Sequence, residues 1–234
     1  MKPGEFETIA GRLWAEIPDR LRQGVEAVEV DEKVVGHPSL PGVYTLGECL
    51  TERWPGAYAD AGDTRSRLVL HHGSFAELAA LDPAFDWELE LSETLLHELL
   101  HHREAAAGER GLEAQDRAEE ENRRRHAGLP FDPVFYRAVP SDADGSVRLD
   151  SEIFVEARGG GSDSEARFTW RGHEYGLRVP RGDGAAFVQV PNLARGRLWV
   201  VVRPRRSWWA RILGRPEAPP RQLKIRALPA RRAG

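Results

Sequence analysis

The chain of 234 residues contains a single cysteine, Cys49. No disulfide can therefore form within it, and its composition does not point to an oxidising compartment. No stretch approaches the roughly 18 apolar residues of a membrane-spanning helix, and residues 1–10 lack the apolar run of a signal peptide. Lysine and arginine number 33 against 37 aspartates and glutamates, a formal net charge of −4 that gives no bulk attraction for nucleic acid. We therefore expect a cytoplasmic protein with no transmembrane segment and no nucleic-acid partner.

The rest of the composition is that of a folded chain whose two halves differ in their predicted secondary structure. Hydrophobic residues make up 41% and charged residues 30%, which is enough for a hydrophobic core. Helical and strand patterns are mixed up to Pro140, and short β-like runs separated by turn residues follow it. We predict an α+β protein with a mixed domain over residues 1–140 and a small all-β sandwich over residues 148–230.

Two predicted helices in the first half carry most of the candidate functional residues. Residues 86–107 show a helical repeat of leucines that ends before Gly108, and glycine commonly follows a helix end. A highly charged helix is predicted next, over residues 112–125. Upstream, residues 25–35 and 65–72 have the composition of strands.

The strongest chemical signal is the HExxH motif formed by residues 97–101. Histidines four residues apart on a helix share one face, so the imidazoles of His97 and His101 can bind one metal ion. Glu98 follows the first histidine, which places its carboxylate beside the open position of the metal. The spacing therefore predicts a Zn²⁺ site in which Glu98 is the catalytic base.

The motif leaves the third protein ligand open. The longer pattern HExxHxxGxxH would place a histidine at position 107, which is Ala107, so a carboxylate must serve instead. Glu113, Asp116 and Glu120 lie on one face of the next predicted helix. Asp116 and Glu113 are the leading candidates, although such a run is also typical of a solvated charged surface.

Four short stretches resemble, in order and spacing, the minimal zincin (DUF1025-type) metallopeptidases of bacteria. They are residues 44–47 (YTLG), 50–53 (LTER), 67–73 (RLVLHHG) and 94–102 (TLLHELLHH). The resemblance covers about half of the chain. It implies a compact zincin core, in which a small mixed sheet packs on two helices including the active-site helix, and a metallopeptidase activity.

One departure from the family pattern concerns the third ligand. The family follows its second histidine with xxGxxD, whereas this chain has Glu104 and Ala107 at the glycine and aspartate positions. The aspartate-bearing segment would then be displaced to residues 111–116.

The zincin pattern also implies a place for substrate. If the sheet follows that pattern, residues 67–72 form its antiparallel edge strand, to which an extended peptide can add as a further strand. His71 and His72, at the end of this strand, would then lie near the cleft and bind substrate.

The second half resembles a different family. Residues 176–184 (GLRVPRGDG) and 195–202 (RGRLWVVV) are similar to the C-terminal substrate-binding domain of DnaJ-type co-chaperones, in which a strand ending in Pro-x-Gly turns back. This similarity implies a β-sandwich that binds extended or unfolded polypeptide.

These patterns predict a zinc metallopeptidase that hydrolyses peptide bonds with a metal-bound water assisted by Glu98. Its partner would be a peptide or an unfolded polypeptide. The alternative is a catalytically silent or vestigial zincin scaffold that carries a polypeptide-binding, chaperone-like β domain. The two hypotheses differ in whether replacing Glu98 abolishes a hydrolytic activity.

Overall fold

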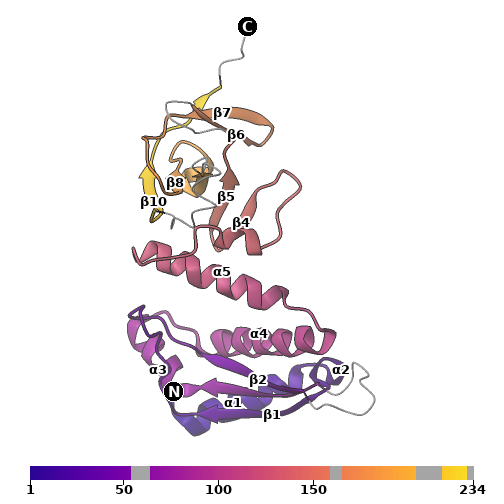
Figure 1. Cartoon of the computed structure of the whole chain (residues 1–234). Coiled ribbons are helices and arrows are strands. Elements are labelled where there is room, and N and C mark those ends of the chain that lie inside the picture. The colour runs from indigo at the N-terminus through magenta and orange to yellow at the C-terminus, as the bar shows by residue number, and fades with distance from the viewer. Residues whose placement is uncertain (54–63, 159–164, 204–217, 231–234) are drawn as a thin grey trace. The chain divides into compact units, whose positions relative to one another are not determined.

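The computed structural model describes the chain except for residues 54–63, 159–164, 204–217 and 231–234 (Figure 1). It contains helices and several sheets, which confirms the predicted α+β class. The chain divides into two compact units, Met1–Glu113 and Ala114–Gly234. Among the described residues, no helix is both long enough and apolar enough to cross a membrane.

Helix boundaries in the first unit follow local sequence signals. Pro18 separates the first two helices, because proline cannot continue the backbone hydrogen bonding of a helix. Asp86 caps the longest helix by accepting hydrogen bonds from the backbone nitrogens of Glu88 and Leu89, each over 3.1 Å. Gly108 ends that helix in the left-handed conformation, with φ of 73°. The elements are α1 (Pro3–Glu16), α2 (Asp19–Arg22), β1 (Val25–Asp31), β2 (Gly47–Arg53), β3 (Thr64–His71), α3 (His72–Leu81) and α4 (Trp87–Ala107).

The three strands of this unit form one sheet in the order β1-β3-β2. β3 is parallel to β1 and antiparallel to β2. The expectation that residues 67–72 form the edge strand is therefore wrong, since β3 is hydrogen-bonded on both sides. β2 lies at an edge of this described sheet and is the antiparallel strand.

One face of the sheet is covered by helices. Phe6 of α1, Phe75 of α3 and Leu91 of α4 are fully buried together with Leu70 of β3. This packing holds α4 against the sheet along its length, with Leu95 and Leu99 on the same buried side. The HExxH motif is thus carried by a helix anchored on its apolar face.

The second unit begins within α5 (Gly111–His126) and contains two further sheets. One has the strand order β10-β8-β9-β5-β4, and the other has the order β11-β7-β6. Buried residues of both sheets, among them Phe168, Leu177, Val188 and Val200, form one hydrophobic cluster. The elements are η1 (Phe135–Ala138), β4 (Val147–Leu149), β5 (Glu152–Glu156), β6 (Ala166–Trp170), β7 (His173–Leu177), β8 (Ala186–Gln189), η2 (Ala194–Gly196), β9 (Leu198–Val202), β10 (Arg221–Lys224) and β11 (Leu228–Pro229).

The division between the units differs from the predicted boundary near residues 141–147. Ala118 of α5 and the two aromatic residues Phe135 and Tyr136 pack with Phe154 and Phe187 in a second hydrophobic cluster. These contacts join α5 and η1 to the strands that follow them. Most of the predicted first domain after Glu113 therefore packs with the second unit.

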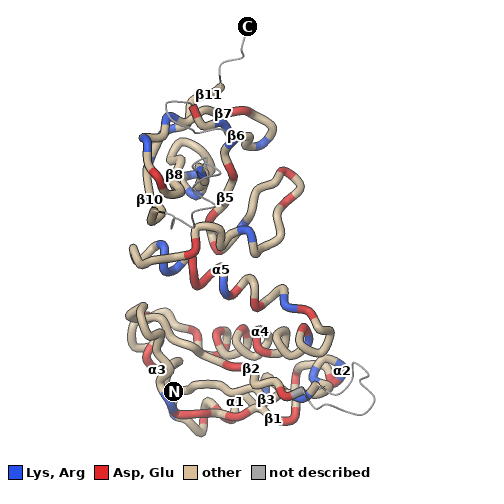
Figure 2. The backbone as a smooth tube through the Cα atoms, viewed as in Figure 1, with Lys and Arg blue, Asp and Glu red and all other residues tan. Residues whose placement is uncertain are grey.

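Acidic and basic residues both occur along α5 (Figure 2). Its first turn carries Glu113 and its last turn is basic, from Arg123 to His126, which matches the dipole of a helix. Arg125 is fully buried and its guanidinium lies 4.2 Å from the centre of the Trp199 ring. It also donates a hydrogen bond to Glu152. These contacts fix the C-terminal end of α5 to β5 and β9 within the second unit.

Candidate metal centre

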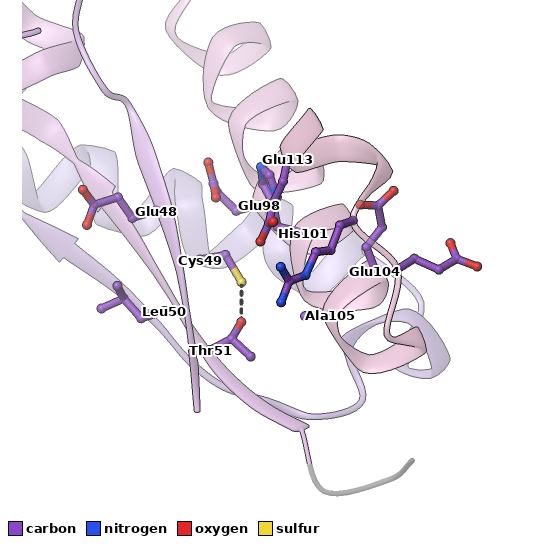
Figure 3. Close-up of a pocket in the computed structure, with 11 residues that line it drawn as sticks. Glu48, Cys49, Leu50, Thr51, Glu98, His101, Glu104, Ala105 and Glu113 are labelled. Atoms are coloured by element: carbon purple, nitrogen blue, oxygen red, sulfur yellow. Dashed lines mark hydrogen bonds between the residues drawn. The ribbon is translucent and has the colours of Figure 1, made fainter. Parts of the chain in front are cut away.

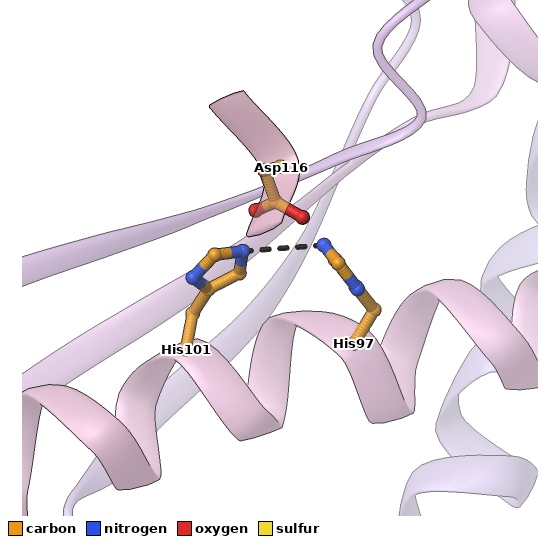
Figure 4. Close-up of side chains that lie close together, drawn as sticks. All are labelled: His97, His101 and Asp116. Carbon is orange, nitrogen blue, oxygen red and sulfur yellow. Dashed lines mark hydrogen bonds between the residues drawn. The ribbon is translucent and has the colours of Figure 1, made fainter. Parts of the chain in front are cut away.

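The two histidines of the motif converge on one point beside α4. The Nε2 atoms of His97 and His101 lie 3.2 Å apart, and their rings are nearly perpendicular, at 84° (Figure 4). The geometry follows from the four-residue spacing on a helix, which places the two side chains one above the other. The predicted pairing of these histidines is thus present in the structure.

Asp116 completes a group of three possible metal ligands. One carboxylate oxygen of Asp116 and one nitrogen of each histidine all lie within 4.8 Å of one another (Figure 4). The start of α5 is held against α4 by the backbone nitrogen of Leu112, which donates to Oε2 of Glu104 over 2.7 Å. Asp116 follows Leu112 on the same helix by about one turn.

The other two carboxylates of the predicted face have different positions. Glu113 lines a neighbouring cavity but is not a member of the group of three. Glu120 pairs with Arg123 one turn along α5, with 3.5 Å between Oε2 and Nε. Of the three carboxylates that the sequence offered, Asp116 is the one grouped with the two histidines.

Glu98 lies on the inner side of α4 and is only 6% exposed. Its side chain approaches the first residue of β2 closely: a methyl group built on Gly47 would lie 2.9 Å from Cγ of Glu98. Glu98 and His101 line the same cavity (Figure 3). The predicted base therefore sits in a confined position beside the histidine pair.

The cavity of about 770 Å³ lies between β2, α4 and the start of α5. Its backbone wall is β2, where Cys49 and Thr51 project toward α4 while Glu48 and Leu50 project to the other side (Figure 3). Burial raises the pKa of the Cys49 thiol. The lining residues are Glu48, Cys49, Leu50, Thr51, Glu98, His101, Glu104, Ala105, Glu109, Arg110 and Glu113.

His71 and His72, predicted to bind substrate, do not line this cavity. His72 is 8% exposed and stacks on Trp87, with 5.9 Å between ring centres. His71 is 4% exposed and its Nε2 lies 3.8 Å from Oε1 of Glu48. The prediction placed them at a strand edge, whereas β3 is central and runs directly into α3. The ring of His72 packs against Phe6 and Trp87.

His102, next to the second metal-binding candidate, has a structural role that its sequence position did not indicate. Its ring is 1% exposed, and Nε2 lies 2.9 Å from the carbonyl oxygen of Gln23. A carbonyl only accepts, so Nε2 carries the proton and Nδ1 accepts from the hydroxyl of Ser66 at 2.8 Å. Ser66 in turn contacts the hydroxyl of Thr51 at 3.0 Å. This chain of hydrogen bonds ties α4 to β3 and β2.

The comparisons with known proteins name no function. No protein-family model and no curated protein matches the chain. A solved structure that does match is a conserved hypothetical protein from Thermus thermophilus, with 38% identity and a TM-score of 0.38. The match covers 46% of this chain and 98% of the other.

Proposed function

We propose that the protein is a zinc-dependent metallopeptidase whose first unit is a minimal zincin core. The observation that carries the proposal is the convergence of His97, His101 and Asp116 beside the buried carboxylate of Glu98. Two nitrogens bound to one tetrahedral zinc ion at about 2.0–2.1 Å are separated by about 3.3–3.4 Å. The observed separation of 3.2 Å between the two Nε2 atoms fits that requirement.

The donor set fits zinc in its composition as well as in its spacing. Two imidazoles and one carboxylate are a common ligand set of catalytic zinc sites, which keep a fourth position for water or substrate. Zinc held by these residues would act as a Lewis acid and lower the pKa of a bound water toward neutrality.

Glu98 supplies the proton transfers that peptide hydrolysis needs. Its carboxylate accepts a proton from the water that attacks the peptide carbonyl, and it delivers that proton to the nitrogen of the leaving amine. Because Glu98 is almost entirely buried, few solvent waters compete for its oxygens. The neighbouring cavity gives a polypeptide access to it.

The outer edge of β2 is the surface along which we place the substrate. Residues 48–51 of β2 line the cavity that Glu98 and His101 also line. A strand edge offers amide and carbonyl groups to which an extended polypeptide adds as a further strand. This assignment replaces the edge expected at residues 67–72, because β3 has partners on both sides.

We propose that the second unit is a β-sandwich that recruits extended or unfolded polypeptide. The support is the hydrophobic cluster shared by its two sheets, which contains Phe168 of β6 and Val200 of β9. In a sandwich, residues of two facing sheets interdigitate in this way. The resemblance to the substrate-binding domain of DnaJ-type co-chaperones supplies the class of ligand.

The test compares the wild type with Glu98→Gln, which keeps the shape of the side chain and removes its charge. Each protein is purified without added metal, its zinc content is measured, and a mixture of peptides is incubated with it and read by mass spectrometry. We expect about one zinc per chain in both proteins and a loss of about 100- to 10,000-fold in hydrolysis for the variant. Glu93→Gln changes an exposed glutamate that lies earlier on α4 and is the matched control.

Two results would contradict the proposal. Hydrolysis by Glu98→Gln at the wild-type rate would remove Glu98 from the reaction. Absence of zinc, with no uptake on dialysis against it, would favour the catalytically silent scaffold. In that case polypeptide binding by the second unit becomes the property to measure.

A further inference from the structure

We infer that Gly47 is a positioning residue for Glu98, and this inference rests on the proposed peptidase function. Gly47 is the first residue of β2 and lies against α4. A methyl group built on its Cα would lie 2.7 Å from Cγ2 of Thr94, 2.9 Å from Cγ of Glu98 and 3.1 Å from Oε1 of Glu98. Carbon contacts below about 3.0 Å are not tolerated, since optimal separations are about 3.5–4.0 Å. No residue larger than glycine fits here without movement.

Neither the strand nor the threonine can readily supply that movement. Gly47 pairs with Leu70 of the central strand β3. The side chain of Leu70 is fully buried, so β3 keeps the start of β2 from moving away from α4. Thr94 donates its hydroxyl to the carbonyl of Glu90 over 2.8 Å, which fixes the rotamer that points its methyl group at Gly47. β-branched side chains have few alternative rotamers in a helix.

Glu98 is therefore the side chain that must yield to a larger residue at position 47. Its carboxylate is one bond beyond the methylene that the added methyl group would strike. Displacement of a catalytic group by about 1 Å can cost about 100-fold in rate. The glycine thus serves the reaction by leaving the carboxylate of Glu98 in place, and it does so without contacting substrate or metal.

The experiment uses the full-length protein with Gly47→Ala and, as matched control, Gly36→Ala. A methyl group on Gly36 would lie 3.9 Å from its nearest neighbour, the ring of Tyr44, which is ordinary contact. We measure zinc content, kcat and KM, and determine the crystal structures of the wild type and Gly47→Ala. We expect unchanged zinc and KM, a fall in kcat of about 100-fold, and a carboxylate of Glu98 shifted away from β2. Gly36→Ala should match the wild type in every measurement.

A second variant keeps the test decisive if Gly47→Ala folds poorly. Gly47→Ala/Thr94→Ser retains the hydroxyl that binds Glu90 and removes the methyl group that meets position 47, so stability should recover while kcat stays low. Recovery of kcat in step with stability would show that Gly47 acts through packing alone and would overturn the inference. An unshifted carboxylate in the crystal structure of the single variant would also overturn it. If the wild type hydrolyses no peptide, a shifted carboxylate still supports the positioning role while the peptidase proposal fails.

Discussion

The ring of His102 is held from both sides: Nδ1 accepts from Ser66 at 2.8 Å and Nε2 donates to the carbonyl of Gln23 at 2.9 Å. His102 follows His101 directly, yet its ring points into the protein. The three histidines of α4 thus have two different roles. His97 and His101 converge on one side of the helix, and His102 attaches the helix to the sheet.

We expect His102→Phe to destabilise the protein without removing its metal site. Phenylalanine fills a similar space but removes the hydrogen bonds to the carbonyl of Gln23 and to Ser66, which is 2% exposed. Loss of a partner by a buried polar group costs about 1–3 kcal/mol. Urea denaturation measures this loss, and zinc analysis of the same sample should still give the wild-type content. His173→Phe is the control, because His173 is exposed on β7 and should change stability by less than about 0.5 kcal/mol. Loss of zinc in His102→Phe would instead make His102 a ligand.

The third ligand can be identified by comparing Asp116→Asn with Glu113→Gln. Both changes remove one carboxylate charge from α5, but only Asp116 groups with the histidines, while Glu113 lines the cavity. Loss of an outer-shell partner costs about 10–100-fold in metal affinity, and we expect loss of a direct ligand to cost at least about 100-fold. Competition with a zinc-binding dye measures the affinity. Equal weakening by the two variants would show that only the overall charge matters.

Substitution by alanine at two glycines of the first unit should change the stability of the protein in opposite directions. Gly11 lies inside α1 with no atom within 4 Å of an added methyl group, so Gly11→Ala should stabilise by about 0.5–1 kcal/mol. Gly24 has φ of 93°, and an added methyl group would lie 2.9 Å from the carbonyl oxygen of Thr64. We expect Gly24→Ala to lose more than about 1–2 kcal/mol. Thermal denaturation of the two variants checks the pair, and a stabilised Gly24→Ala would contradict the backbone geometry.

The histidine pair and its helix could be predicted because their geometry is local. Residues four apart on a helix lie together whatever the rest of the fold does, and Asp86 and Gly108 mark the ends of α4 in the sequence itself. The carboxylate that joins the histidines could not be predicted in this way. Whether Asp116 or Glu113 faces the histidines depends on the rotation of α5 about its axis, and the contact between Leu112 and Glu104 that holds its first turn joins two elements.

Strand order and burial depend on distant segments, and here sequence reasoning failed. The apolar run at residues 68–70 indicates a strand within residues 65–72 but cannot say that β1 and β2 flank it. His71 and His72 are polar, and their burial depends on packing partners such as Trp87. Gly47 carries no periodic signal at all. Only the close approach of α4 shows why a side chain is absent there.

The second unit should lose stability in acid through Glu152. Burial alone would raise the pKa of this carboxyl, but the charges of Arg125 and His126 and hydrogen bonds from Trp199 and Asn122 hold it below its ordinary value of 4.5. A carboxyl whose pKa is lower in the folded state stabilises that state above its unfolded pKa, and the contribution is lost as the pH falls through the folded pKa. Amide exchange in β9, measured between about pH 3 and pH 6, reports this loss within the unit itself.

Variants of the buried ion pair between Arg125 and Glu152 show whether protonation of Glu152, or of other carboxyl groups, causes the loss of stability in acid. Arg125→Met leaves the carboxylate of Glu152 without its buried partner, which should cost about 3–5 kcal/mol at neutral pH. Arg125→Met/Glu152→Gln removes both charges, so it should be much less destabilised at neutral pH and show a weaker dependence on acid. Part of the dependence should remain, because a hydrogen bond from Arg137 also holds the pKa of Glu156 below its ordinary value. A double variant with the full acid dependence of the wild type would show that Glu152 is not its source.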